Sequence, residues 1–178
     1  GYVMGNSLRL CVDLGLHAEK LNKNYDPFVK DMRRRLFWVT YSIDRQICLY
    51  FGRPFGIPEE SITTASISEL DDALITTNND GVEDYSHLKT SGSSYKSISL
   101  AFFKIRRMQS TLLQVLYAPR GVVPKPFDNV EIWRKGFDRE LLNWYNKSVP
   151  KTTKKMNCSF KKELFKLNLF HTRTMLYG

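Results

Sequence analysis

The chain of 178 residues is long enough for one domain that buries about 70% of the surface its unfolded form exposes, and a hydrophobic share of 42% with 13% aromatic residues excludes disorder over most of the length. No run approaches the ~18 consecutive apolar residues of a membrane span, so we expect no contact with a membrane. The net charge of +9 is not gathered in one block, which favours a solvated basic face over direct nucleic-acid binding.

The first predicted helix covers residues 2–14. Its apolar residues share one face at helical spacing: Val3 or Met4, Leu8, Cys11 and Leu14. Gly15 is the expected left-handed residue after the helix, and Leu16 can close back on Cys11.

A second helix is predicted between Asp26, whose side chain can cap the first turn, and Gly52, which can take a left-handed C-terminal conformation. Pro27 fits the first helical position, and Pro54 cannot continue the helix. Apolar residues alternate at gaps of three and four and so share one side: Phe28, Met32, Leu36, Val39, Ile43, Ile47 and Tyr50. The other sides are also apolar in the second half, through Phe37, Trp38, Tyr41, Cys48, Leu49 and Phe51. We therefore predict a long helix buried at the centre of the fold.

Charged residues interrupt this apolar helix, and a buried charge must be paired because desolvating it alone costs several kcal/mol. We expect Asp44 to pair with Arg53 or Arg35. The arginine triplet at residues 33–35 fans around the helix, since successive residues point about 100° apart. One inward ion pair and two solvated arginines are therefore expected, rather than a nuclear-localisation or phosphate-binding patch.

The chain after Pro54 is irregular and acidic, and residues 76–97 are poor in large apolar side chains, which predicts a mobile loop or linker. Helical spacing resumes at Ile98 and ends at Pro119, and a further helix is predicted after an N-cap at Asp128. The inward residues of that helix are Val130, Trp133, Phe137, Leu141 and Trp144. A basic loop is predicted at residues 151–157. The last helix begins at about residue 159, and the side chains at four of its positions are expected to face the core: Leu164, Leu167, Phe170 or His171, and Met175. About five helices and no convincing strand predict an all-α fold, an irregular multi-helix domain around the long central helix.

Ten residues of the second predicted helix and the turn after it form a specific pattern. They are Arg33, Arg34, Arg35, Phe37, Trp38, Asp44, Arg45, Gly52, Arg53 and Pro54. This pattern resembles the signature of the fungal-specific transcription-factor domain, the regulatory middle region of fungal binuclear zinc-cluster regulators. Residues 8–10 and 13–17 resemble the helix that precedes the signature in that family, and residues 167–177 loosely resemble a later helix.

The resemblance implies that residues 1–178 are part of one regulatory domain with a flexible loop at about residues 76–97. It implies a nuclear protein that binds DNA through an N-terminal zinc cluster absent from this chain and controls transcription by RNA polymerase II. Zinc is thus expected outside this chain and no cofactor within it. The family leaves open a homodimer, a small-molecule effector and co-regulator proteins as partners. The alternative is a helical scaffold or adaptor without a role in transcription.

No residue pattern in the chain points to metal binding. Cys11, Cys48 and Cys158 lack the short spacing of a thiolate zinc site, and their odd number argues against disulfides and for a reducing, intracellular environment. The three histidines lie far apart in the sequence, at His17, His87 and His171, and are expected to cap or pack.

Catalytic motifs are also missing from the sequence. There is no glycine-rich phosphate loop and no Gly-x-Ser-x-Gly turn, and the adjacent acids Glu59–Glu60 and Asp71–Asp72 are expected to be solvated. We therefore expect no enzymatic activity. The aromatic residues are most simply core, and the alternative is that they line an apolar cavity between helices that binds an effector.

Overall fold

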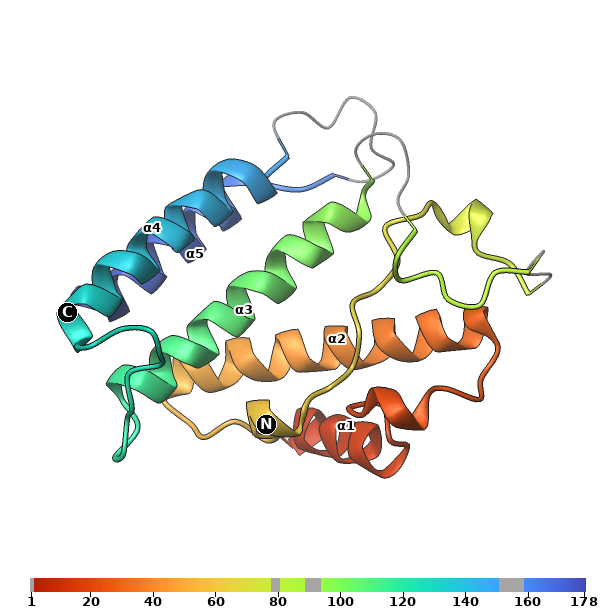
Figure 1. Ribbon diagram of the computed structural model, residues 1–178, viewed down its shortest axis with the longest axis horizontal. Coiled ribbons are helices and arrows are strands. Elements are labelled where there is room, and N and C mark those ends of the chain that lie inside the picture. Colours follow the sequence, from red (N-terminus) through yellow and green to blue (C-terminus); the bar gives the residue numbers. More distant parts are fainter. Residues whose placement is uncertain (1, 78–80, 89–93, 151–158) are drawn as a thin grey trace. The chain divides into compact units, whose positions relative to one another are not determined.

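The computed structural model describes residues 2–77, 81–88, 94–150 and 159–178, and over these residues the chain forms five α-helices and no strand (Figure 1). The helices are α1 (Tyr2–Asp13), α2 (Pro27–Phe51), α3 (Lys96–Leu116), α4 (Val130–Ser148) and α5 (Lys162–Tyr177). Short 3-10 turns cover Glu19–Leu21, Glu59–Ser61 and Asp72–Leu74. The all-α prediction is confirmed. Cys158, the predicted basic loop at 151–157 and parts of the predicted loop at 76–97 lie outside the described residues.

The chain divides into two compact units, Gly1–Lys96 (unit 1) and Ser97–Gly178 (unit 2). Unit 1 is built on α2, and α1 packs against it. The predicted ends of α2 are confirmed. The Asp26 carboxylate accepts a hydrogen bond from the Phe28 N–H at 2.9 Å, and Gly52 ends the helix with φ of 59°. Arg53 N–H then bonds back to the Cys48 carbonyl at 2.9 Å, which closes the last turn.

The predicted burial of α2 is confirmed for Phe37, Trp38, Tyr41 and Cys48 but is wrong for the face of seven apolar residues. Four of its seven apolar residues are exposed: Leu36, Val39, Ile43 and Tyr50. The buried face lies on the opposite side of the helix and carries both aromatic and charged residues: Asp31, Arg34, Phe37, Trp38, Thr40, Tyr41, Asp44, Arg45 and Cys48. The physical reason is that the charged members of this face find partners in unit 1, so that burying them is not prohibitive.

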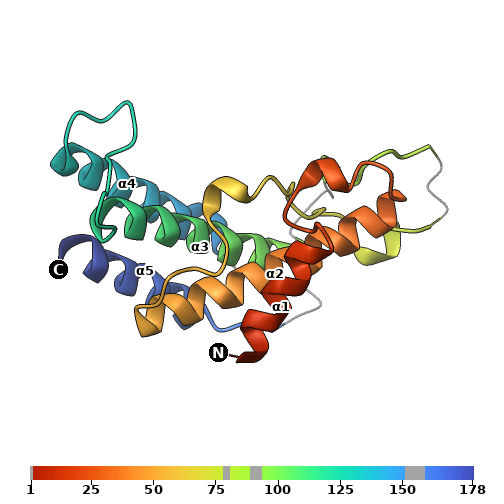
Figure 2. The same cartoon turned by 90° about the horizontal axis from the view of Figure 1, so that it is seen from below.

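The segment that follows α2 returns along the buried face of that helix, as Figure 2 shows for the gold stretch. Its backbone is fixed to successive turns of α2. Arg45 donates to the Ile57 carbonyl at 2.7 Å, the Trp38 indole donates to the Ala65 carbonyl at 2.8 Å, and Asp31 accepts from Ser68 N–H at 2.8 Å. A segment without regular structure is thus ordered by hydrogen bonds to side chains of α2.

The first helix also differs from its prediction in part. Leu8 and Cys11 are buried as expected, whereas Val3 and Leu14 are exposed. Gly15 has the predicted positive φ, 68°, and Leu16 N–H bonds to the Cys11 carbonyl at 2.8 Å.

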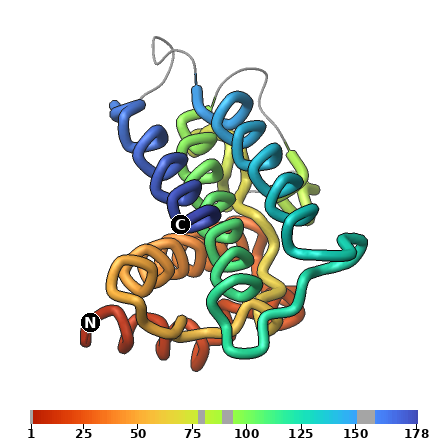
Figure 3. Tube along the Cα trace, turned by 90° about the vertical axis from the view of Figure 1, so that its left-hand side faces the viewer, coloured from red at the N-terminus to blue at the C-terminus, as the bar shows by residue number. Residues whose placement is uncertain are grey.

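Unit 2 is a bundle of α3, α4 and α5, which run side by side in Figures 1 and 3. Its core contains Ile105, Leu112, Leu141, Trp144 and Phe165, all fully buried. The Trp144 indole donates to the Ala101 carbonyl at 2.9 Å, so the largest core side chain has its polar atom satisfied. The predicted α4 face is confirmed for Trp133, Phe137, Leu141 and Trp144, although the N-cap is Asn129, one residue after the predicted Asp128.

The predicted face of α5 is wrong, because Leu164, Leu167 and Phe170 are exposed. The buried residues of α5 are Phe165, Asn168, Leu169, Thr172 and Leu176. Two of these are polar and meet polar groups of α3. Arg106 donates to the side-chain amide oxygen of Asn168 at 2.8 Å, and the Gln109 side-chain amide donates to the Thr172 hydroxyl at 2.9 Å. Because of these hydrogen bonds, Asn168 and Thr172 can be buried on α5, although the apolar spacing predicted a different side of the helix to be buried.

The two faces of α2 give a direct test of this packing. Trp38 is 5% exposed and packs edge-on against Phe37 and Tyr41, whereas Leu36 is 55% exposed. We expect Trp38→Ala to lower the free energy of unfolding by about 3–5 kcal/mol through loss of burial and formation of a cavity. Leu36→Ala should cost less than about 1 kcal/mol. Denaturant unfolding of both variants measures the difference, and equal losses would contradict the assignment of faces.

Candidate functional site: the ionic network of the central helix

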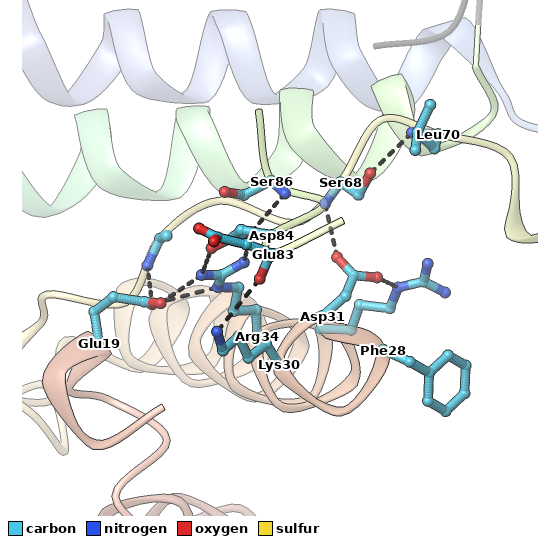
Figure 4. Close-up of polar contacts among 12 residues, drawn as sticks. Glu19, Phe28, Lys30, Asp31, Arg34, Ser68, Leu70, Glu83, Asp84 and Ser86 are labelled. Atoms are coloured by element: carbon cyan, nitrogen blue, oxygen red, sulfur yellow. Dashed lines mark hydrogen bonds and ion pairs between the residues drawn. The ribbon is translucent and has the colours of Figure 1, made fainter. Parts of the chain in front are cut away.

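Arg34 of α2 is almost fully enclosed, with 2% of its side chain exposed, and two carboxylates hold it (Figure 4). Asp84 accepts from Nη1 at 2.6 Å and from Nη2 at 2.7 Å, a bidentate pair. Glu19 accepts from Nε at 3.3 Å and from Nη2. Glu19 also accepts from Ala65 N–H at 2.8 Å, and Asp84 from Ser86 N–H at 2.8 Å. One guanidinium therefore joins three stretches of chain to α2.

A second group of charges lies near the start of α2. Asp31 is fully buried and accepts from Arg35 Nε at 2.6 Å as well as from Ser68 N–H. Arg35 Nη2 forms a further ion pair at 2.6 Å with Asp72, and the Lys96 ammonium lies 2.9 Å from that same carboxylate. Tyr95 donates its hydroxyl hydrogen to Asp72. The Asp72–Leu74 turn, Tyr95 and Lys96, all within unit 1, are thereby tied to α2.

The third group surrounds Arg45, which is 1% exposed. Its guanidinium contacts the Asp44 carboxylate at 2.9 Å and that of Glu59 at 3.3 Å. It also lies over the rings of Tyr41 and Phe55, at 4.4 and 4.2 Å from their centroids. A planar cation between two aromatic faces and two carboxylates is well compensated for its loss of water.

The pairing predicted for Asp44 is wrong. Its partner is the neighbouring Arg45, while Arg35 binds Asp31 and Asp72, and Arg53 is exposed beyond the helix end. The prediction that two arginines of the triplet are solvated is also wrong. Arg33 donates to the Asn22 side-chain oxygen and to the Leu14 carbonyl, both at 2.7 Å. All three arginines of the triplet therefore bind other parts of unit 1.

The network changes the proton affinity of its members. Hydrogen bonds from Arg34 outweigh partial burial and hold the pKa of Asp84 well below its usual range. Burial alone would raise the pKa of Asp72 and of Glu19. Hydrogen bonds to Asp72 from Arg35, Tyr95 and Lys96, and to Glu19 from Arg34 and Ala65, outweigh that effect and lower both values. Burial and the bond to Asp72 raise the pKa of Tyr95 to about 12.

Sequence reasoning missed the acidic half of this network. Glu59 and Asp72 were expected to be solvated, and Asp84 lies in the stretch predicted as a mobile loop. Next to Asp84, Tyr85 is buried, with its hydroxyl donating to the Thr76 carbonyl at 3.1 Å. The only signal in the sequence was the need of each arginine on an apolar helix for a carboxylate, which does not say where that carboxylate lies.

The described residues offer no group of three or more His, Cys, Asp and Glu that could hold a metal ion. Cys11 and Cys48 are free and buried, and burial raises the pKa of both thiols. A cavity of about 470 Å³ in unit 1 is lined by Leu8, His17, Asp44 and Ile57 among others, and none of the tryptophans or phenylalanines lines it. No described helix has the length and apolar character needed to cross a bilayer.

The fold and this network define a helical unit whose central helix, α2, is held by buried ion pairs. The chain matches the Fungal specific transcription factor domain over residues 1–146, so it belongs to that family. It is therefore a regulatory domain of fungal transcription factors, as the resemblance at the arginine triplet implied.

Three relatives illustrate the match. The chain is 53% identical over 177 residues to pyrimidine pathway regulatory protein 1 of Saccharomyces cerevisiae, covering 99% of this chain and 20% of that protein. It is 31% identical over 226 residues to the positive regulator of purine utilization of Emericella nidulans, covering 99% and 21%. It is 30% identical over 165 residues to an uncharacterized transcriptional regulatory protein of Schizosaccharomyces pombe, covering 93% and 19%. The chain thus spans about a fifth of the length of these relatives, and no solved structure matches it.

The enclosure of Arg34 predicts a large loss of stability when its side chain is removed. Arg34→Ala leaves Glu19 and Asp84 facing each other without their shared cation and should lower the free energy of unfolding by about 3 kcal/mol. The matched variant is Arg33→Ala, which removes two hydrogen bonds from a less buried side chain and should cost about 1 kcal/mol. Denaturant unfolding compares them. An equal or smaller loss for Arg34→Ala would contradict the network's role in stability.

The lowered pKa values predict acid sensitivity. Glu19, Asp72 and Asp84 bind protons less readily in the folded state than in the unfolded chain. The stability they contribute is therefore complete above the unfolded carboxyl pKa of about 4 and is lost as the pH falls below it. Asp84→Asn should lower the Tm at neutral pH and reduce the further fall in Tm between about pH 7 and pH 3. Glu60→Gln, at an exposed position, should leave the wild-type pH profile unchanged, and an unaltered profile for Asp84→Asn would contradict the assignment.

Proposed function

We propose that the intact protein is a nuclear regulator of pyrimidine-pathway genes and that this chain sets its activity. The regulator would bind DNA through a zinc cluster outside these residues and control transcription by RNA polymerase II. The 53% identity to pyrimidine pathway regulatory protein 1, over 99% of this chain, supports the choice of pathway. The proposal places zinc outside this chain, as the family resemblance implies.

Within the chain, the Arg34 network is the observation that carries the regulatory role. The guanidinium is shared between Glu19 and Asp84, which come from opposite ends of unit 1 in the sequence. Breaking either ion pair would release a stretch that has little regular structure of its own. A unit held in this way has a natural second state, in which one of these stretches is loosened while α2 remains folded.

The alternative is a helical adaptor without a role in transcription. The exposed apolar side of α2 is compatible with both functions, because it can contact a second copy of the chain or a co-regulator. A small-molecule effector also remains part of the proposal, and the cavity beside His17 has the volume for one. We favour the regulator because two of the relatives are named as regulators, one of the pyrimidine pathway and one of purine utilization.

A reporter assay with the intact protein tests this proposal. Asp84→Asn keeps Arg34 and removes one of its two anionic partners. We expect reporter output from a pyrimidine-pathway promoter to change several-fold at unchanged protein abundance, because the balance between held and loosened unit 1 is altered. DNA binding measured in extract should stay the same, since the zinc cluster would be a separate unit.

The control is Glu60→Gln, which makes the same chemical change at an exposed position and should leave output unchanged. Unchanged output and inducibility in a stably expressed Asp84→Asn protein would remove the network from regulation. Unchanged output after deletion of the whole gene would instead favour the adaptor.

A further inference from the structure

The exposed side of α5 carries a run of apolar residues that unit 2 does not cover. Leu164, Leu167, Phe170 and Tyr177 are 48%, 54%, 51% and 56% exposed. Leu167, Phe170 and Tyr177 are three and seven residues apart, so they share one side of the helix, and Leu164 borders it. This side lies opposite the buried residues Phe165, Leu169 and Leu176. We call these four exposed residues the α5 face.

Positive charge borders the α5 face. Lys162 and Lys166 are exposed and lie on the same edge of the helix, four residues apart, with Lys161 directly before the first turn. The Lys166 ammonium lies 5.8 Å from the centroid of the Phe170 ring, so the basic edge and the apolar face meet. Arg173, further along this edge, is bound by Asp138 of α4 at 2.8 and 3.0 Å.

The charge of the chain is distributed unequally between the two units. Unit 2 contains 16 lysines and arginines against five aspartates and glutamates, whereas unit 1 contains 11 against 13. The net positive charge of the protein therefore belongs to unit 2. A partner with negative charge would be attracted to unit 2 before contact, and the lysine edge would fix its orientation on α5.

We propose that the α5 face binds an acidic amphipathic helix of a partner protein. Its apolar residues would cover Leu167, Phe170 and Tyr177, and its carboxylates would pair with Lys162 and Lys166. Recognition of this kind places residues at three- and four-residue spacing against an apolar surface and adds charge pairs at the border.

Nucleic acid fits this surface less well. A phosphate backbone would pair with the lysines but would leave the apolar residues in contact with water. Leucine side chains add little to phosphate binding, whereas they are typical anchors in the docking of amphipathic helices.

Fluorescence anisotropy with the full chain tests the proposal. The probe is a labelled synthetic peptide of about 20 residues with leucine and phenylalanine on one helical side and glutamate elsewhere. The wild-type chain should bind it, with affinity falling as salt is raised. Phe170→Glu and Lys166→Glu should each raise the Kd by about ten-fold or more, the first by placing charge on the apolar face and the second by reversing a charge pair.

Two variants of α4 serve as matched controls. Ile132→Glu places a charge at an apolar position that is also about half exposed, and Lys135→Glu reverses an exposed charge of unit 2. Both should change the Kd less than about two-fold. Thermal melts of all four variants should match the wild type, because every altered side chain is exposed. A peptide of the same composition in scrambled order should bind at least about ten-fold more weakly.

Absence of binding, or equal effects of the α4 and α5 variants, would overturn the proposal. Tight duplex DNA binding that Lys166→Glu abolishes and Phe170→Glu leaves intact, with no peptide binding, would assign the surface to nucleic acid instead. The proposal goes beyond the regulatory role of unit 1. A failed peptide assay leaves the Asp84→Asn reporter result unaffected, so the two can fail separately.

Discussion

The folded structure of unit 1 depends on the carboxylates that offset the cost of burying one cation, Arg34. Removing a guanidinium from water is costly, and Arg34 is almost fully enclosed, so its site is stable only while carboxylates remain beside it. Those carboxylates belong to Glu19 and Asp84, in a short 3-10 turn and in a stretch without regular structure. Neither stretch contains an α-helix of its own. The charge on α2 therefore specifies the positions of segments that hydrophobic packing alone would leave undefined.

The same principle repeats along the helix. Asp31 with Arg35, and Arg45 with Asp44 and Glu59, place further parts of the returning segment against successive turns of α2. Between these charged groups, Trp38 and Tyr41 supply the apolar contact, and both direct their polar atoms to acceptors on that segment or its turn. The buried side of α2 thus stabilises unit 1 in two ways. Aromatic packing buries apolar surface, and each hydrogen bond fixes the position of the returning segment along the helix.

The two units differ in the way they use charge. In unit 1 three of the α2 arginines, Arg34, Arg35 and Arg45, bind carboxylates of the same unit, and acids and bases nearly balance in number. Unit 2 has a largely apolar core with a small buried polar group around Arg106, and most of its lysines are left on the surface. Charge in unit 1 therefore serves folding, whereas most of the positive charge of unit 2 lies on its surface.

The sequence by itself determined where the helices lie and how they end. Asp26 and Gly52 act through their own backbone neighbours, so local chemistry was sufficient to place both ends of α2. The arginine triplet and the residues after it were sufficient to indicate the family. Helical spacing also identified the buried side of α4, where every core position is apolar.

Only the tertiary structure decided which sides of α2 and α5 are buried. Apolar spacing pointed to Leu36 and Ile43 on one helix and to Leu167 and Phe170 on the other, all of which are exposed. The buried sides hold Arg34 and Asn168, whose partners are 15 to 62 residues away in the sequence. Whether a polar side chain can be buried depends on partners that only the folded chain brings near, and a pattern of apolar residues contains no information about them.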